Sequence, residues 1–505
     1  MILGKCYIIH ILLMCFYGVF IFFTFIYQNK VSMKHICALL LLFVFEYNLY
    51  SQSCQNLNLQ LQANIPSPCA KMTMGARQDL LGRPYLYVAQ KEAGLTIYDI
   101  TNISSPVLVK NIPIDSLDML HVMNLQQDSN YLYLALGNSF NTGQNPGMAI
   151  IDISTPTTAS VTSVWKSGFT TGGSGIVKVE NNYAYLGAMY NGLMILDISN
   201  KSNITYVSRY VPNRNYPTTV NPASDTTHYN ARGLEVKNSI AYLCYDKGGF
   251  RVINCTNKNN LVETGRYCNP VLNSLQRAYN NIVIEDTLAY IAVDYCGMEI
   301  LNIKDTAHIT LCSWWNPWHC QSNPFNWFGS NGHTNEIEYN KNCKLIFLSS
   351  GKSDMRIVDV SNPTAPDSCN YYGNIVDSLG TWGLSMNGNN IFLSYICTPG
   401  VPFYSNWTGV KIITYSGCNV TGIEEVSKKN DVSVYPVPNS GSFVVEPNNS
   451  ARQMLQVYDI SGKLVLSQYI QGKTNLNASN LSEGVYNLSL ISSEGVVSRK
   501  LVIIK

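Results

Sequence analysis

The sequence predicts an all-β protein: a seven-bladed β-propeller followed by a small C-terminal β-sandwich of the Ig-like kind. Three observations support this fold class. A short strand motif occurs seven times, each copy lies in a unit of four strand-like segments, and no convincing amphipathic helix follows residue 60. The 33 tyrosines and 35 glycines also favour strands and tight turns over helices.

The motif reads Gly-Leu-Met-Ile-Leu-Asp-Ile-Ser-Asn at residues 192–200, an apolar run that a glycine opens and turn-forming residues close. Related stretches begin at residues 94, 147, 249, 297, 354 and 409, at intervals of 45–57 residues. A recurring unit of this length with one strand-like core is typical of repeat architectures.

The aspartate of the motif recurs as Asp99, Asp152, Asp197 and Asp359. A functional interpretation would make these residues a ring of carboxylates. Asparagine takes the same place at Asn254 and Asn302, and an amide can accept backbone N–H bonds but cannot do acid–base work. We therefore interpret the aspartates as caps of the turn that follows the strand.

Each motif is the third of four expected strands. In the third unit these are residues 176–180, 183–187, 192–198 and 204–210, and the fourth and fifth units repeat the order. Four antiparallel strands in each of seven units indicate a seven-bladed β-propeller. The motif is apolar on successive residues because neighbouring blades cover both faces of each blade.

The first strand of the mature chain is expected to close the ring. The seventh unit shows no fourth strand after residue 415, whereas residues 57–62 alternate with the period of a strand and can pair antiparallel with residues 410–415. That pairing places Cys54 beside Cys418 and predicts a Cys54–Cys418 disulfide, with Cys54–Cys69 as the alternative. Twelve of the fifteen cysteines follow residue 52, and export makes disulfides plausible.

The N-terminus contains two apolar stretches. From Met33 the sequence reads as a signal peptide, with a short basic region, an apolar core and small residues near position 51, so we expect translation to start at Met33. A transmembrane anchor at residues 7–27 is the alternative. The expected organisation is an N-terminal apolar segment and signal peptide (1–51), the propeller (52–418), a polar linker (419–430) and a C-terminal domain (431–505).

Composition and motifs exclude several functions. The net charge of +2 with 13% charged residues gives no sign of nucleic-acid or anionic-membrane binding. A nucleophile elbow, a phosphate-binding loop and a His-Glu-x-x-His motif are all absent from the sequence, and it has only seven histidines. We therefore assign no catalytic residue, no metal and no cofactor.

The long insertions indicate a binding face. The clearest are residues 137–146, 211–230, 316–332 and 397–408, which emerge on one face of a propeller. Residues leading into the innermost strands should converge there around the axial mouth, in a pocket for a glycan or another anionic or hydroxylated ligand, or else be separately solvated. These candidates are His121, His228, Arg232, Arg277, His333 and Trp382.

The densest aromatic stretch of the chain runs from residue 314 to residue 328. We expect Trp314 and Trp315 to pack inside a blade. Trp318 and Trp327 are candidate ligand-binding residues, because flat rings can stack on sugar faces. The alternative is that they form a small hydrophobic core within the loop itself.

Residues 70–418 resemble LVIVD-type propeller repeats, in which a Tyr-Ala-Tyr-Val-like strand precedes a Gly-Leu-x-Ile-x-Asp-Val-Ser-like strand. The likeness weakens in units five and seven, where Asn302 and Thr414 replace the aspartate. The repeat family has no single assigned activity, so the resemblance implies the fold rather than a reaction.

The C-terminal 75 residues resemble the type A sorting domain of the type IX secretion system of Bacteroidetes. The resemblance implies export past the inner and outer membranes, contact with the secretion machinery, and release or attachment at the cell surface. The sequence departs from the Tyr-Pro-Asn-Pro of the family at Val437. The residues that carry the resemblance are Tyr435, Pro436, Pro438, Asn439, Gly462, Gly484, Tyr486 and Lys505.

Together these features lead us to expect a secreted or cell-surface binding or adhesion module whose ligand is a glycan or a protein. The alternative is an extracellular glycan-acting hydrolase or lyase with its site at the axial mouth, which two carboxylates facing each other there would favour. A purely structural surface protein remains a third hypothesis, because fold alone does not decide function.

Overall fold

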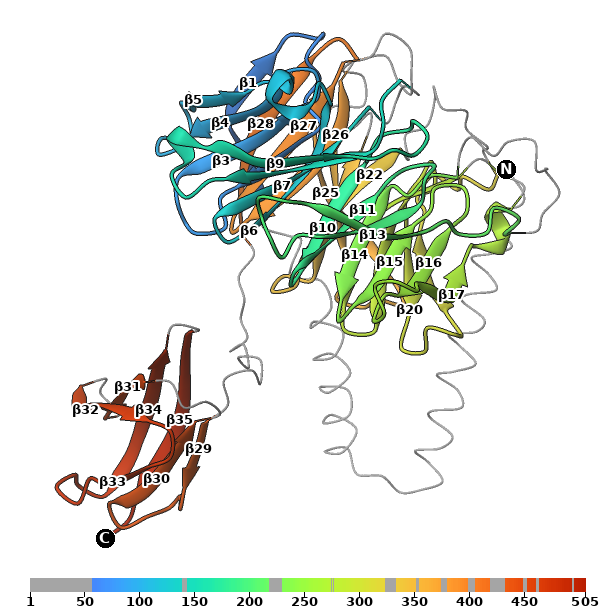
Figure 1. Ribbon diagram of the computed structural model, residues 1–505. Helices are drawn as coiled ribbons and strands as arrows, with labels where there is room; N and C mark the ends of the chain where they lie inside the picture. Colours follow the sequence, from blue (N-terminus) through green and yellow to red (C-terminus); the bar gives the residue numbers. More distant parts are fainter. Residues whose placement is uncertain are drawn as a thin grey trace, which may run out of the picture. The chain divides into compact units, whose positions relative to one another are not determined.

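Seven four-stranded antiparallel sheets form a ring in the computed structural model of the protein, and the C-terminal strands form two further sheets (Figure 1). The predicted fold class is therefore confirmed. The structure describes residues 57–138, 143–217, 229–273, 275, 277–322, 333–350, 354–373, 379–397, 405–417, 432–447, 452–459, 463–492 and 495–505.

The strands of each blade follow one another in chain order from the axis to the rim. Blades one to three comprise β2 (Gly75–Gln78), β3 (Tyr85–Gln90), β4 (Gly94–Asp99), β5 (Val107–Ile112); β6 (Val122–Asp128), β7 (Tyr131–Leu136), β8 (Gly147–Asp152), β9 (Ser160–Lys166); β10 (Ile176–Glu180), β11 (Tyr183–Gly187), β12 (Leu193–Asp197), β13 (Thr205–Tyr210). Blades four to six comprise β14 (Gly233–Lys237), β15 (Ile240–Cys244), β16 (Phe250–Asn254), β17 (Val262–Tyr267); β18 (Ala278–Glu285), β19 (Leu288–Asp294), β20 (Met298–Asn302), β21 (Thr310–Trp315); β22 (Thr334–Asn340), β23 (Leu345–Ser350), β24 (Asp354–Asp359), β25 (Asp367–Tyr372). Blade seven comprises β26 (Gly380–Asn387), β27 (Asn390–Ile396), β28 (Thr408–Ser416) and β1 (Asn58–Ser67). Short 3₁₀ turns lie at Ile114–Leu117, Pro156–Thr158 and Pro270–Leu272.

The hydrophobic core of the ring consists of one cluster of buried residues between each pair of adjacent blades. In blade three, Met194 and Leu196 of β12 pack toward blade two, whereas Leu193 and Ile195 pack toward blade four. Because successive side chains of a strand point to opposite faces, a strand between two neighbours must be apolar at every position. This explains the uninterrupted apolar run of the motif.

The glycine that opens the motif is required by the approach of the outermost strand. Gly192 and Gly249 have φ values of 77° and 81°, in the left-handed region that L side chains rarely adopt. A Cβ atom would lie 2.3 Å from the Tyr210 carbonyl oxygen at Gly192 and 2.4 Å from that of Tyr267 at Gly249. Glycine thus lets the third strand begin directly beside the end of the fourth.

The repeated aspartate caps the turn after the third strand, as predicted. In six blades its side-chain oxygen accepts a hydrogen bond of 2.7–3.0 Å from the backbone N–H two residues later, and asparagine makes the same bond as aspartate. The hydroxyl of the serine two residues later and, after it, this backbone hydrogen bond hold the pKa of Asp152 and Asp197 below the usual aspartate range. The carboxylates are scaffold and do not form a ring around a ligand.

We expect Asp197→Ala to lower the free energy of unfolding by about 1 kcal/mol and Asp197→Asn to lower it much less, because the amide still accepts the Ser199 N–H bond. The folded pKa of Asp197 is lowered, so the contribution of its charge is present above the unfolded pKa and is lost as the pH falls through the folded pKa. Urea unfolding at pH 7 and below pH 4 measures both effects. Equal losses for Ala and Asn would show that the turn does not use this bond.

β1 closes the ring by pairing antiparallel with β28, from Asn58 opposite Ser416 to Ser67 opposite Thr408. The predicted closure is confirmed, and a Cys69–Cys397 disulfide also joins the two ends of the propeller sequence across 328 residues. The alternative Cys54–Cys69 bond is wrong, because Cys69 is bonded to Cys397. Cys54 and Cys418 lie outside the described residues, and their bond remains a prediction. A second disulfide joins Cys296 to Cys320.

The C-terminal unit is a small sandwich with its own core. One sheet contains β29 (Val432–Tyr435), β30 (Ser442–Pro447) and β33 (Thr474–Asn477). The other contains β32 (Leu464–Gln471), β31 (Arg452–Tyr458), β34 (Gly484–Ser492) and β35 (Gly495–Ile503). Phe443, Leu455 and Leu488 are among the buried residues between them. The chain divides into compact units at residues 419 and 420.

Several residues of the C-terminal motif hold the last strand in place. The Asn439 side chain donates to the Val502 carbonyl at 3.3 Å, and its backbone exchanges two hydrogen bonds with Val502 and Ile504. Lys505 donates to the Ser479 carbonyl at 2.9 Å and Tyr486 to that of Ser482 at 2.8 Å. The motif thus fixes the chain end against the sandwich.

The described residues contain no helix long and apolar enough to cross a membrane. The expected signal peptide and the alternative anchor at residues 7–27 lie outside those residues, as do Gly462 and the expected linker.

Candidate functional site at the propeller axis

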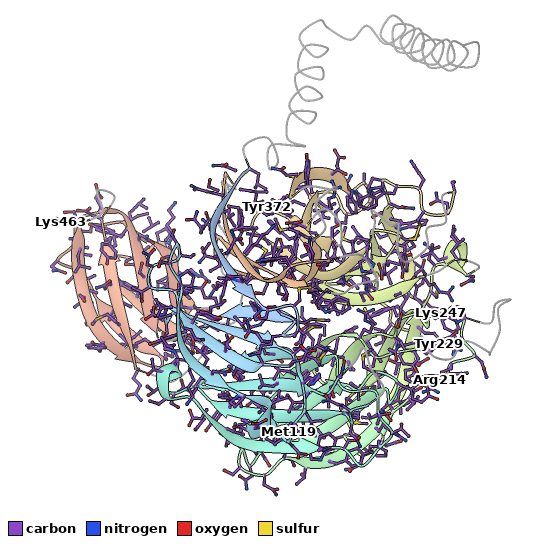
Figure 2. All side chains as sticks on the ribbon, turned by 90° about the horizontal axis from the view of Figure 1, so that it is seen from above. Met119, Arg214, Tyr229, Lys247, Tyr372 and Lys463 are labelled. Carbon is purple, nitrogen blue, oxygen red and sulfur yellow. A yellow bond between two sulfur atoms is a disulfide. The ribbon has the colours of Figure 1, made fainter. Side chains whose placement is uncertain are left out.

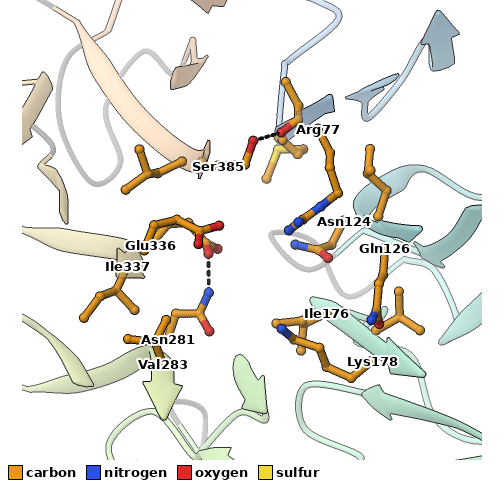
Figure 3. A pocket seen from close by; sticks show the side chains of 18 of the residues that line it. Arg77, Asn124, Gln126, Ile176, Lys178, Asn281, Val283, Glu336, Ile337 and Ser385 are labelled. Carbon is orange, nitrogen blue, oxygen red and sulfur yellow. Dashed lines mark hydrogen bonds between the residues drawn. The ribbon is translucent and has the colours of Figure 1, made fainter. Parts of the chain in front are cut away.

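A cavity of about 190 Å³ lies on the axis of the ring, and the innermost strand of every blade contributes to its wall (Figure 3). Its charged and polar lining comes from β2 (Arg77), β6 (Asn124, Gln126), β10 (Lys178), β14 (Glu235), β18 (Asn281), β22 (Glu336, Glu338) and β26 (Ser385). None of the described residues that line it is aromatic.

β-bulges near the start of four innermost strands direct side chains at the axis. The register shifts between Val122 and Asn124 in β6, between Tyr279 and Asn281 in β18, between Thr334 and Ile337 in β22, and between Thr381 and Gly383 in β26. A bulge inserts an unpaired residue and re-aims its neighbours. Glu336 and Trp382 are themselves residues of these bulges.

Hydrogen bonds between adjacent blades hold the wall of the cavity together. Asn280 donates to the Thr334 carbonyl at 2.6 Å and Ser385 to the Ala76 carbonyl at 2.5 Å, while Gln126 accepts from the Val179 N–H at 2.7 Å. These bonds link blades five and six, seven and one, and two and three. Hydrogen bonds therefore fix the positions of neighbouring innermost strands at three of the junctions between blades.

The charges of the cavity are unevenly compensated. Lys178 and Glu235 form an ion pair at 2.8 Å. Glu336 accepts a hydrogen bond from Asn281, and Figure 3 shows both on the side of the cavity opposite Arg77 and Asn124. Among the described residues, the side chains of Arg77 and Glu338 form no hydrogen bond or ion pair, although the Arg77 charge acts on the Glu338 carboxyl.

Burial raises the pKa of both carboxyl groups on β22. The pKa of Glu336 is raised to about 7 by loss of solvation and by the nearby Glu338, against the hydrogen bond from Asn281 and the charges of Lys178 and Arg232. The pKa of Glu338 is raised by loss of solvation and by Glu235, against the charges of Arg77 and Lys178. Both carboxyl groups are therefore more easily protonated than an exposed glutamate.

Two predicted site residues meet at the end of the cavity where the innermost strands begin. Arg232 directly precedes β14 of blade four, and Trp382 lies in β26 of blade seven. The Arg232 guanidinium lies 5.1 Å from the centre of the Trp382 ring. A cation–π contact thus joins two non-adjacent blades at the axial mouth.

The two described histidines near the mouth have different environments. His121 is half-buried, and burial lowers its pKa. His333 is only 2% exposed, its Nδ1 contacts the Asp294 carboxylate, and its ring packs against Tyr295 at 5.8 Å. A ligand at the mouth can contact His121 more readily than His333.

Arg277 and Trp318 lie away from an open pocket. The Arg277 guanidinium donates to the carbonyls of Lys247, Leu272 and Asn273 at 2.7–3.1 Å, so it caps the Pro270–Leu272 turn. Trp318 packs edge-on against Trp315 at 5.3 Å, with the Arg356 guanidinium 5.6 Å from its ring.

Trp314 and Trp315 were expected to pack inside a blade; on β21, the outermost strand of blade five, Trp315 is buried and Trp314 is half-buried. Their indole N–H groups donate to the Cys296 carbonyl at 2.8 Å and to the Ser368 hydroxyl at 3.0 Å. His228 and Trp327 lie outside the described residues.

The face of the propeller on which the long insertions emerge is called the loop face. Basic and aromatic side chains also lie close together at its rim, beside blade four. The Arg214 guanidinium lies 3.6 Å from the centre of the Tyr190 ring, which is 40% exposed. Figure 2 shows Arg214, Tyr229 and Lys247 close together at the edge of the propeller. Arg214 and Tyr229 belong to the 211–230 insertion, and Lys247 lies in the turn between β15 and β16.

Sequence reasoning missed the charged residues inside the cavity. The signal was present, because Lys178, Glu235, Glu336 and Glu338 interrupt innermost strands that apolar residues would otherwise fill. Within the described part of the chain, no group of three or more His, Cys, Asp or Glu side chains could hold a metal ion.

Family models match two parts of the chain. The LVIVD repeat matches residues 83–113, 171–211 and 347–372. The secretion system C-terminal sorting domain matches residues 433–504. The chain matches no curated protein sequence.

Several solved structures are similar to this chain at low sequence identity. They include the C-terminal WD40 domain of Sif2, with 12% identity, a TM-score of 0.46, and coverage of 70% of this chain and 98% of that one. Sqt1 of Saccharomyces cerevisiae has 8% identity and a TM-score of 0.46, with coverage of 88% and 100%. The computationally designed Ika8 protein has 8% identity and a TM-score of 0.41, with coverage of 70% and 99%.

Proposed function

The chain is an LVIVD-repeat β-propeller with a C-terminal sorting domain of the type IX secretion system, and from that premise we propose that it is a binding or adhesion module whose loop face binds a glycan or a protein. The sorting domain implies secretion beyond the outer membrane and contact with the secretion machinery. The propeller is then the part that meets the extracellular surroundings.

The observation that carries this proposal is the contact between Arg232 and Trp382 at the axial mouth. An indole face stacks on the apolar face of a sugar ring or of a protein side chain, and a guanidinium donates several hydrogen bonds to hydroxyl or carboxylate oxygens. The rim contact between Arg214 and Tyr190 adds the same two groups on the loop face. His121 completes the proposed mouth.

We expect Trp382→Ala and Arg232→Ala each to weaken capture of the ligand at least tenfold. Truncating an aromatic or arginine anchor in the centre of an interface removes more binding energy than truncating a rim residue. A glycan array and a panel of extracellular matrix proteins, probed with the purified mature protein, identify the ligand, and titration calorimetry measures the change.

Arg266→Ala is the matched control, since this arginine is 47% exposed on the outermost strand of blade four. It should bind as the unchanged protein does. If Trp382→Ala and Arg232→Ala retain full affinity for a ligand that the protein captures, the mouth is not the binding site. If neither panel yields a ligand, the binding module itself is rejected.

A glycan-cleaving activity is the second candidate, and the carboxylates of β22 favour it. Glu336 has its pKa raised to about 7, which suits a general acid, and Glu338 lies beside it in the cavity. Product analysis after incubation of the protein with any captured glycan distinguishes the two functions. Cleavage that Glu336→Gln abolishes supports an enzyme, and intact glycan supports binding alone.

A further inference from the structure

The interior of the axial cavity is distinct from the mouth and has its own chemistry. At about 190 Å³ it is somewhat larger than a cavity of about 150 Å³ that holds benzene. A Cβ atom at Gly75, which lines the wall, would meet nothing within 4 Å. The space therefore accommodates a small molecule rather than a side chain of the protein.

The cavity presents opposite charges on opposite walls. Figure 3 shows Arg77 on one side and Glu336 on the other, and Glu338 follows Glu336 by two residues on β22. Lys178 and Glu235 form an ion pair, whereas the side chains of Arg77 and Glu338 make no hydrogen bond or ion pair among the described residues and act on each other only through their charges. Charged groups removed from bulk water are costly unless something pairs with them.

We propose that the axial cavity binds a small zwitterion, with the anionic group of the ligand on Arg77 and its ammonium group on Glu336 and Glu338. Asn124 and Gln126 lie on the wall next to Arg77 and supply amide donors for the anionic group. Asn281 positions the Glu336 carboxylate for the ammonium group. The proposal is independent of glycan or protein binding at the mouth.

Other ligand classes fit the lining less well. A simple anion satisfies Arg77 but meets the carboxylates across the cavity, and a simple cation meets the reverse conflict. A sugar lacks a stacking partner among the described residues that line the cavity, since none of them is aromatic. A zwitterion compensates both walls at once.

Binding should depend on pH because Glu336 must be ionised to hold an ammonium group. Its pKa of about 7 means that affinity rises as the pH increases from 6 to 8. The groups that face it are Asn281, Glu338, Lys178 and Arg232, and burial raises the pKa of the Glu338 carboxyl as well. Glu336→Gln should remove most of this dependence.

The test is titration calorimetry of the mature protein with β-alanine, 4-aminobutyrate and proline, each compared with butylamine and butyrate. We expect saturable binding of at least one zwitterion and at least tenfold weaker binding of both singly charged probes. Arg77→Gln and Glu338→Gln should each weaken zwitterion binding at least tenfold. Arg266→Gln and Glu446→Gln, which change exposed residues outside the cavity, should not.

Gly75→Leu separates loss of the cavity from loss of the fold. It fills the open space without altering a charge, so we expect it to abolish zwitterion binding while thermal unfolding and ligand capture at the mouth stay unchanged. Equal binding of butylamine or butyrate, unchanged binding by Gly75→Leu, or no binding by any of the three zwitterions would overturn the proposal. The last result leaves water as the occupant and does not affect the mouth.

Discussion

Removal of the Cys69–Cys397 disulfide is expected to lower the free energy of unfolding by roughly 4–6 kcal/mol when Cys54 and Cys418 are also replaced by serine. The bond closes a loop of 328 residues, and a longer closed loop removes more conformational entropy from the unfolded chain. The serine background prevents the predicted Cys54–Cys418 bond from holding the same two ends together. Equilibrium unfolding in urea under oxidising conditions measures the difference.

The Cys296–Cys320 disulfide is the internal control, because its ends are only 24 residues apart. Its removal should cost about 3 kcal/mol on the same reasoning. If the two removals cost the same, closure of the ring by β1 does not depend on the covalent bond. If removal of Cys69–Cys397 costs little only while Cys54 and Cys418 are present, the predicted Cys54–Cys418 bond is supported.

Arg251→Met should destabilise the propeller by about 3–5 kcal/mol. The Arg251 side chain is fully buried and makes an ion pair with Glu263 at 3.2 Å. It also donates to the carbonyls of Gly248, Asn213 and Tyr216 at 3.1–3.2 Å. Methionine fills the space but leaves a mostly buried carboxylate and three carbonyl groups without their donor.

Arg266→Met tests whether the effect comes from burial or from charge, because Arg266 contacts the same Glu263 carboxylate at 3.8 Å but is 47% exposed. It should cost less than about 1 kcal/mol, as exposed ion pairs do. Thermal unfolding of both variants beside the unchanged protein makes the comparison. Losses of similar size would show that Arg251 contributes no more than a surface charge.

The repeat made most of the fold predictable. Residues 176–180 and 183–187 are strands β10 and β11 as predicted, because a blade buried on both faces requires unbroken apolar runs with turn residues at fixed offsets. The closing strand was predictable for the same reason: β1 alternates in period two, and blade seven lacks a fourth strand of its own. At these positions the alternation of apolar and polar residues along the sequence and the burial of the strands in the propeller require the same structure.

The β-bulges were not predictable, and they decide the site. Nothing in the pattern around Glu336 or Trp382 distinguishes a bulged from a regular strand, yet the bulge determines what each side chain faces. Arg232 and Trp382 contact each other near the start of their innermost strands, and their role in binding stays a prediction. Arg277 and His333 share the same position before an innermost strand but are engaged by carbonyl groups and by Asp294. Sequence position gave proximity to the axis but not the direction of the side chain.

The pairing of β1 with β28 has a consequence for biogenesis. The ribosome makes β1 before every other strand of the propeller and makes β26, β27 and β28 after the other six blades, so an interrupted chain leaves blade seven incomplete. The residues that match the sorting domain, 433–504, are translated only after all four of these strands. Every molecule that carries the sorting domain therefore also carries all the strands needed to close the ring.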